Sequence, residues 1–162
     1  LGIHSKCGDL EYLVSCFYKK TPLDGKMEDG RTALEHCCDM IIEKNVVELA
    51  VETNTVSNIK SQIETILHSK GYRSCVITEI YSTQKKCDKI YDNQSTILEY
   101  VVFPARNLYG IGSMMGRYMK NIVTWHAKTK DNDDSIDTEA MFAQHFIRGT
   151  KVRRGSIQVL RL

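Results

Sequence analysis

The chain has 162 residues, of which 42% are hydrophobic and 26% charged, a composition typical of one folded domain with a buried core. Its formal net charge of +2 is too small to indicate a nucleic-acid or membrane partner by itself. No apolar run approaches the roughly 18 residues of a membrane-spanning helix, and no signal-peptide pattern is present, so we expect no membrane partner. Because the chain begins with Leu1 and opens almost directly into strand-like sequence, we expect it to be part of a longer protein.

The chain contains six cysteines, and none of them forms a Cys-x-x-Cys pair. Without such short spacings a zinc site is not expected. We expect buried free thiols in a reducing compartment.

In chain order, strand-like stretches alternate with helical patterns. The β-branched and aromatic runs at residues 11–19, 46–51, 74–81 and 97–103 predict strands. Helices are predicted from the capping box Thr32-Ala-Leu-Glu35 to Asn45, from Ser57 to Gly71, around residues 118–123, and over residues 136–147. This alternation predicts an α/β fold with a layered sheet, and such sheets place their sites at the carboxyl ends of strands.

The last part of the chain departs from this pattern. Residues 148–162 contain several basic side chains and no acidic one. The basic residues are Arg148, Lys151, Arg153, Arg154 and Arg161. We therefore expect one folded domain over residues 1–147, followed by a flexible basic tail over residues 148–162.

An acidic cluster opens the last predicted helix. It consists of Asp131, Asp133, Asp134 and Asp137, and like charges this close repel one another. One interpretation is a solvated helix N-terminus with more capping carboxylates than it needs. The other is that a divalent cation such as Mg²⁺ neutralises the cluster, which requires a further carboxylate from elsewhere in the chain.

Glu52 is a candidate for that further carboxylate. It ends an apolar strand and is followed by Asn54, so it points into the crevice where α/β sheets carry their sites. Carboxylates that converge from separate elements can hold two divalent cations about 4 Å apart, the arrangement used in phosphodiester hydrolysis. Asp9 is another candidate, although Gly8-Asp9 before a strand is also ordinary turn sequence.

Lys85, Lys86 and Lys89 follow a predicted strand, where we expect a turn that leads from a loop into a helix. They form either a solvated face or, beside a metal site, a contact for the phosphate backbone of DNA. Arg117 is grouped with them as a DNA-binding candidate. It follows a Gly-Ser-Met-Met-Gly segment whose spacing does not match a Walker phosphate loop, so no ATPase activity is expected within the chain.

Taken together, these segments resemble the C-terminal nuclease domain of the large terminase subunit of tailed bacteriophages, over most of the chain. They match, in order, the family's Glu-x-Asn segment, Gly-Tyr strand lead-in, Asn-Lys-x-x-Arg-Ile turn, Val-x-Phe-Pro strand and His-Asp-Asp-x-x-Asp signature. The matching segments are Glu52-Thr-Asn54, Gly71-Tyr-Arg-Ser-Cys-Val-Ile77, Lys85-Lys-Cys-Asp-Lys-Ile90, Tyr100-Val-Val-Phe-Pro104 and Asn132-Asp-Asp-Ser-Ile-Asp137.

The resemblance implies an RNase H-like fold, with a mixed central sheet flanked by helices, and metal-dependent cutting of concatemeric double-stranded viral DNA. It implies two Mg²⁺ or Mn²⁺ ions, with Glu52 and Asp134 as metal ligands and Asp133 and Asp137 close by. It further implies a preceding ATPase domain, the small terminase subunit and the portal protein as partners, and a location in the cytoplasm of the host cell for a viral or prophage protein.

One departure concerns the first strand. The family's first strand normally ends in an Asp shortly before a Gly-Asp like Gly8-Asp9, whereas this region holds Ile3 and His4. Either His4 serves as a nitrogen ligand, or Asp9 takes the role, or the site is weakened. Imidazole suits Mn²⁺ or Zn²⁺ better than Mg²⁺. Two alternatives to a terminase nuclease therefore stay open: a resolvase-type nuclease, and a non-catalytic or impaired module that binds DNA or a partner.

Overall fold

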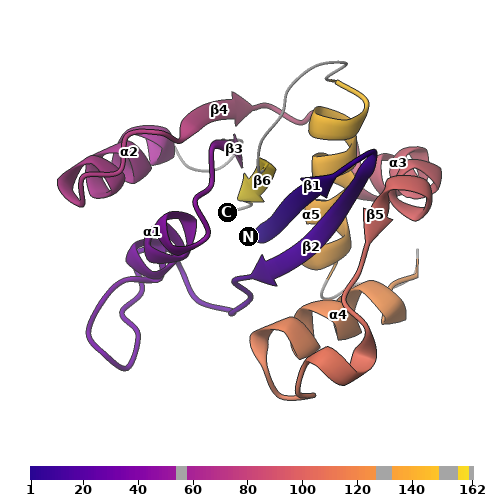
Figure 1. Cartoon of the computed structure of the whole chain (residues 1–162), viewed down its shortest axis with the longest axis horizontal. Helices are drawn as coiled ribbons and strands as arrows, with labels where there is room; N and C mark the ends of the chain where they lie inside the picture. The colour runs from indigo at the N-terminus through magenta and orange to yellow at the C-terminus, as the bar shows by residue number, and fades with distance from the viewer. Residues whose placement is uncertain (54–57, 127–132, 150–156, 161–162) are drawn as a thin grey trace.

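The computed structural model describes residues 1–53, 58–126, 133–149 and 157–160, and these form a mixed sheet flanked by helices (Figure 1). The strand order in the sheet is β4-β3-β6-β1-β2-β5. The strands are β1 (Gly2–Cys7), β2 (Leu10–Cys16), β3 (Glu48–Glu52), β4 (Val76–Ile80), β5 (Val101–Val102) and β6 (Ile157–Leu160). β3 runs parallel to β4 and β6, β1 runs antiparallel to β6 and β2, and β5 runs parallel to β2. The expected α/β class with a mixed sheet is confirmed.

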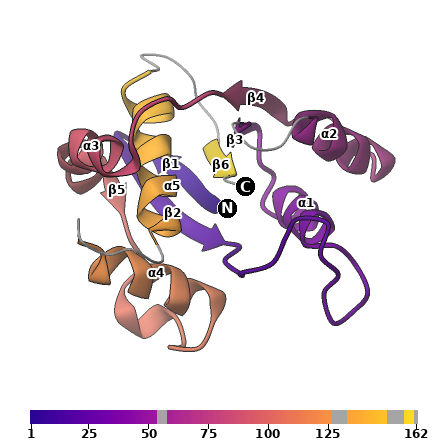
Figure 2. The same ribbon diagram turned by 180° about the vertical axis from the view of Figure 1, so that it is seen from behind.

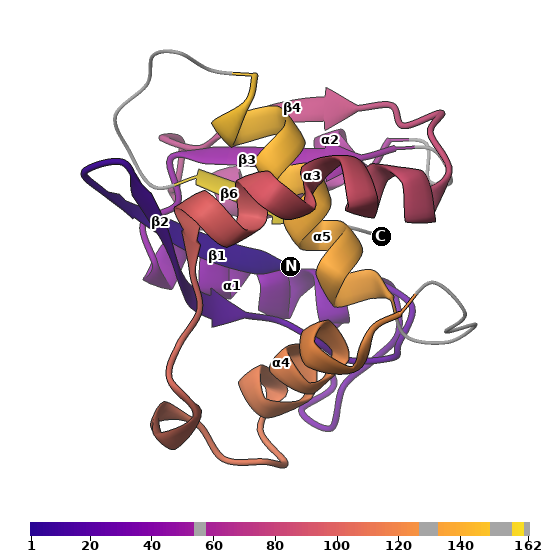
Figure 3. The ribbon, with the colours of Figure 1, turned by 90° about the vertical axis from the view of Figure 1, so that its right-hand side faces the viewer.

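Helices lie on both sides of the sheet (Figure 2). On one side, α1 (Ala33–Glu43) and α2 (Ile59–Ser69) share a core with β1 and β3. On the other side, α3 (Lys86–Tyr100) and α5 (Asp134–Phe142) share a second core (Figure 3). α4 (Met114–Thr124) packs against β2, and α5 continues into a π-helical turn, η2 (Ala143–Ile147). A 3₁₀ turn, η1 (Arg106–Leu108), precedes α4.

The alternation of side chains along β3 positions Glu52. Leu49 and Val51 pack into the core with α1 and α2, whereas Ala50 packs into the core with α3 and α5. Because successive strand residues point to opposite faces, Glu52 lies on the same face as Ala50, two residues before it. The carboxylate at the end of β3 is therefore directed toward α3 and α5.

The capping box predicted for the first helix is confirmed. Oγ1 of Thr32 accepts a hydrogen bond of 3.2 Å from the Glu35 amide, and Glu35 Oε2 accepts one of 2.7 Å from the Thr32 amide. The stop signals are confirmed as well, since Asn45 and Gly71 follow α1 and α2 with positive φ angles of 52° and 77°. The predicted start at Ser57 lies outside the described residues.

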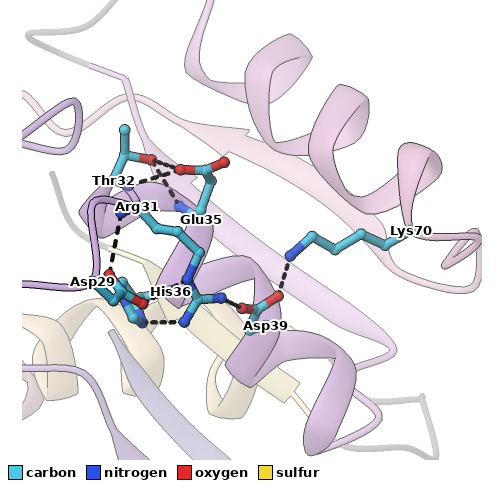
Figure 4. A network of polar contacts seen from close by, with 7 residues as sticks. All are labelled: Asp29, Arg31, Thr32, Glu35, His36, Asp39 and Lys70. Carbon is cyan, nitrogen blue, oxygen red and sulfur yellow. Dashed lines mark hydrogen bonds and ion pairs between the residues drawn. The ribbon is translucent and has the colours of Figure 1, made fainter. Parts of the chain in front are cut away.

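A network of polar side-chain contacts connects the start of α1 with the end of α2 (Figure 4). Arg31 donates to Asp29 at 2.7 Å and also to Asp39 on α1, and Lys70, just after α2, donates to the same Asp39. These cationic donors, Lys70 first, hold the pKa of the Asp39 carboxyl below its usual range. The two helices on this side of the sheet are thus joined by charge as well as by packing.

The structure contains a strand near the amino end that was not predicted and shortens another that was. Gly2–Cys7 is a strand, β1, that forms a hairpin with β2 around Gly8, whose φ is 62°, so the turn interpretation of Gly8-Asp9 is confirmed. The prediction of a strand over residues 97–103 was wrong, because α3 extends to Tyr100 and only Val101–Val102 pairs with the sheet. Asn93 and Ile97 are buried at helical spacing, and this inward face carries the helix through the strand-like sequence.

Part of the basic tail belongs to the sheet. Ile157–Leu160 forms β6, which pairs with β3 on one side and with β1 on the other. The prediction of a flexible arm was wrong for these residues, since they pair as a strand with both β1 and β3. Residues 150–156 and 161–162, which carry most of the tail's basic side chains, lie outside the described residues. No helix in the described part of the chain has the length and apolar character needed to cross a lipid bilayer.

Candidate functional site

Acidic and basic side chains from β3, α3 and α5 meet on one side of the sheet. Lys86 of α3 donates hydrogen bonds to Asp133 and, at 3.1 Å, to Asp134. Lys89, one turn further along α3, lies 2.7 Å from Oδ1 of Asp137 and 3.9 Å from Oε1 of Glu52. We call these six side chains the α3–α5 ladder. Its rungs form because residues three or four apart on a helix share one face.

The two ends of the ladder differ in solvent exposure. Lys89 and Asp137 expose 2% and 0% of their side chains, so their ion pair lies in the protein interior. Asp134 exposes 59% of its side chain at the other end. Charges attract more strongly in the low-dielectric interior, and losing a buried partner costs more there. The ladder therefore has a buried inner rung, Lys89 with Asp137 and Glu52, and a solvent-accessible outer rung, Lys86 with Asp133 and Asp134.

The first turn of α5 is capped in an unexpected way. Asp133 occupies the N-cap position, but its side chain makes no capping hydrogen bond and instead contacts Lys86. The amide of Ser135 donates at 2.9 Å to Oδ1 of Asn121, which comes from α4. Because Asn121 satisfies this helix end, the aspartates of α5 can turn toward α3.

A second buried polar cluster lies on the opposite side of α5. The Tyr118 hydroxyl donates at 2.6 Å to Oε1 of Glu139, and His4 Nε2 lies 3.3 Å from Oε2 of the same carboxylate. His4 also stacks on Phe142 with ring centroids 3.8 Å apart. Burial, and then the charge of Glu139, raise the pKa of Tyr118 well above its usual range. All these side chains are buried, so the cluster joins β1, α4 and α5 and is not open to a substrate.

Gly2 makes room for this cluster. A Cβ atom at Gly2 would lie 2.9 Å from the Tyr118 hydroxyl oxygen and 3.4 Å from Oε1 of Glu139. Sequence analysis did not identify Glu139 or Tyr118 as important. The available signal was Glu139 itself, an acidic residue among the apolar residues of a predicted helix.

A cavity of about 600 Å³ lies beside the outer rung. Asp134 and Thr138 of α5 line it on one side, and the segment after β2, including Lys19 and Lys20, lines it on another. Both lysines are exposed. The cavity thus combines a carboxylate of the ladder with cationic side chains that sequence analysis did not single out.

The structure does not bring Asp9 or His4 to Glu52. Val159 of β6 pairs with Gly2 on one side and with Ala50 on the other, and β1 runs antiparallel to β6 while β3 runs parallel to it. From Gly2 onward β1 therefore leads away from the carboxyl end of β3, and exposed Asp9 lies in the hairpin turn at the opposite end of the sheet. His4 instead contacts Glu139.

The four DNA-binding candidates are divided between surface and interior. Lys85 is exposed at the N-cap of α3, and Arg117 is exposed on α4, where it donates at 2.7 Å to the Gly112 carbonyl oxygen. Lys86 is partly exposed, whereas Lys89 is buried in the ladder. Phosphate could reach the first three from solvent.

The donor chemistry of the ladder fits a hard divalent cation, since Glu52, Asp133, Asp134 and Asp137 supply carboxylate oxygens. Their cationic partners in this structure are the ammonium groups of Lys86 and Lys89. Within residues 1–53, 58–126, 133–149 and 157–160, no group of three or more His, Cys, Asp or Glu side chains is arranged to hold a metal ion. Asn54 and Asp131 lie outside these ranges.

Comparison of the chain with protein-family models, with curated proteins and with solved structures found no match.

Proposed function

We propose that the chain is the nuclease domain of a viral DNA-packaging terminase, a metal-dependent endonuclease that cuts concatemeric double-stranded DNA in the host cytoplasm. The observation that supports this most is the convergence of the acidic residues. Glu52 ends β3 and Asp137 lies on α5, yet both carboxylates lie within 4 Å of the same Lys89 ammonium group. Acidic residues far apart in the sequence thus gather at the carboxyl end of a sheet strand, where α/β proteins carry their sites.

An RNase H-like fold is part of the proposal. The mixed sheet, with helices on both sides, and the strand-end carboxylate on the same face as the acidic helix α5 are consistent with it. The partners proposed from the resemblance are double-stranded DNA, a preceding ATPase domain, the small terminase subunit and the portal protein.

The four acidic residues of the ladder and three exposed lysines have roles in this proposal. Glu52 and Asp134 would hold the divalent cations, with Asp133 close to Asp134 and with Asp137, which shares Lys89 with Glu52, contributing to the ion at Glu52. When bound, Mg²⁺ or Mn²⁺ supplies Lewis-acid chemistry that favours deprotonation of an attacking water and neutralises the departing oxygen. The exposed Lys85, with Lys19 and Lys20 at the cavity, would bind the DNA backbone through its phosphates, which positions the duplex without reading its sequence.

A specific observation favours a second candidate, a non-catalytic module of the same fold that binds DNA. Lysine ammonium groups already neutralise the carboxylates of the ladder, so these acids have a structural role without any metal. In this alternative the exposed lysines bind the duplex and no bond is cut.

Plasmid cleavage separates the two candidates. The chain is incubated with supercoiled plasmid in Mn²⁺, in Mg²⁺ or in EDTA, beside the variant Glu52→Ala. The nuclease proposal expects nicking that requires a metal and disappears in the variant. If the folded chain cuts no plasmid with either metal but slows the migration of plasmid in a gel in a salt-sensitive way, the result would instead support the binding module.

A further inference from the structure

We propose that Lys89 is a built-in competitor of the divalent cation at Glu52 and Asp137, so that metal can bind this carboxylate pair only when the Lys89 ammonium group withdraws. The inference rests on the proposed function, because it concerns the regulation of the same site. It assigns Lys89, predicted from the sequence to contact DNA phosphates, to the control of metal binding instead.

The geometry of the inner rung carries the inference. The Lys89 ammonium group lies 2.7 Å from Oδ1 of Asp137 and 3.9 Å from Oε1 of Glu52. A magnesium ion binds oxygen ligands at about 2.0–2.1 Å, so an ion shared by these two carboxylates needs the space that the ammonium group fills. Two cations that close would also repel strongly in the protein interior. The two cations therefore exclude each other.

Burial makes this competition effective. Lys89 exposes 2% of its side chain, and its charge at this depth is stabilised by the carboxylates beside it. Withdrawal of the ammonium group breaks a buried ion pair, and a metal ion that enters must compensate for that loss. The affinity of the free chain for divalent cations is thereby lowered.

The neighbouring lysine does not meet this condition. Lys86 contacts Asp133 and Asp134, and all three side chains are partly or largely exposed to solvent. Water can screen and replace that contact, so Lys86 opposes a cation only weakly. The inference is therefore specific to Lys89.

The test is a titration of the chain with Mn²⁺, in which binding is measured by calorimetry and by the electron paramagnetic resonance signal of the free ion. Lys89→Gln removes the charge and keeps much of the side-chain length. We expect it to bind Mn²⁺ about tenfold or more tightly than the unmodified chain, and we expect this gain to vanish in the double variant Lys89→Gln/Glu52→Gln. Lys89→Arg, which keeps the charge, and Lys120→Gln, on the exposed side of α4, should resemble the unmodified chain.

Equal Mn²⁺ affinity in the unmodified chain and Lys89→Gln, or no binding by either, overturns the inference. If Lys89→Gln does not fold in EDTA, its melting is measured with increasing Mn²⁺. Recovery of a cooperative transition that depends on Glu52 then supports the inference, and failure to recover counts against it.

Failure of the inference and failure of the proposed function give different results. If Lys89→Gln gains no Mn²⁺ affinity while the unmodified chain nicks plasmid in a Glu52-dependent way, the inference fails and the function stands. If the variant gains Glu52-dependent Mn²⁺ binding while no form of the chain cuts DNA, the inference stands and the function fails.

Discussion

The ammonium group of Lys89 lies 2.7 Å from Oδ1 of Asp137, and both side chains are almost completely shielded from solvent. A buried ion pair adds little net stability compared with a well-packed apolar pair, because both charges have left water. Loss of one partner is a different matter, since the remaining charge stays buried. The inner rung of the ladder is therefore a position where neutral substitutions are costly.

Asp137→Asn is expected to destabilise the fold by about 3–5 kcal/mol, because the buried Lys89 loses the charge of a carboxylate that lies 2.7 Å from its ammonium group. Asp134→Asn, at a largely exposed position, is the matched control and should change the free energy of unfolding by less than about 1 kcal/mol. Urea unfolding of both variants measures the difference. Equal stability of the two would mean that the inner rung is not the buried contact described above.

Tyr118→Phe tests the second buried cluster. The substitution removes the hydroxyl that donates to Oε1 of Glu139, and the free energy of unfolding should fall by about 1–3 kcal/mol because this buried carboxylate loses its shortest hydrogen bond. Tyr81→Phe, at an exposed tyrosine, provides the control for loss of a hydroxyl. A Tyr118→Phe variant as stable as that control would contradict the assignment of a structural role to the cluster.

The network around Asp39 predicts a pH dependence. Its folded-state pKa is lowered, chiefly by the hydrogen bond from Lys70, so its contribution to stability is present above the unfolded pKa near 4 and is lost as the pH falls through the folded value. Asp39→Asn should therefore be less stable than the unmodified chain at pH 7, by up to about 1 kcal/mol because the pair is partly solvated, and the difference should vanish in strong acid. Thermal melting of both forms between about pH 2 and pH 7 checks this. Asp24→Asn, which changes an exposed aspartate, is the control.

Thiol labelling tests the burial of the cysteines. Burial raises the pKa of Cys16 and Cys38 to about 12 and that of Cys37 to about 11, so these thiols carry almost no thiolate in mildly alkaline buffer. Cys7 is exposed and should react first with a disulfide reagent. Cys7→Ser should remove that fastest phase. Mass spectrometry measures the rate at which each cysteine is labelled in the folded chain. If Cys38 is labelled as fast as Cys7, the result would contradict the packing of α1.

Local signals account for the parts of the fold that the sequence predicted well. Thr32 and Glu35 satisfy each other across one helical turn, so the start of α1 depends on four consecutive residues and on nothing distant. The strand at β3 was recognisable because its apolar run is bounded by polar residues. The strand expected over residues 97–103 failed because a short apolar run does not distinguish a strand from the buried face of a helix, and Ile97 belongs to the inward face of α3.

Long-range pairing accounts for what the sequence did not predict. Strand β6 pairs with β1 on one side and with β3 on the other. It was not predicted because the short apolar run of residues 157–160 lies within a basic segment. The acids of the candidate site were recognised as a group, but their lysine partners were not, since Lys86 and Asp133 are 47 residues apart and meet only through the packing of α3 on α5. Lys89 was therefore expected at a DNA-binding surface and is found in the interior.

Whether the Glu52 carboxylate takes part in DNA cleavage is measured by the rate of plasmid nicking in Mn²⁺, with the unmodified chain, Glu52→Gln and Glu28→Gln side by side. Glu52→Gln keeps the shape of the side chain at the end of β3 and removes its charge, while Glu28→Gln makes the same change in the exposed loop before α1. We expect nicking by the unmodified chain and by Glu28→Gln, and a rate about a hundredfold or more lower for Glu52→Gln. Nicking by Glu52→Gln at the unmodified rate, or its absence in all three folded proteins, would contradict the claim that the acids around the ladder cut DNA.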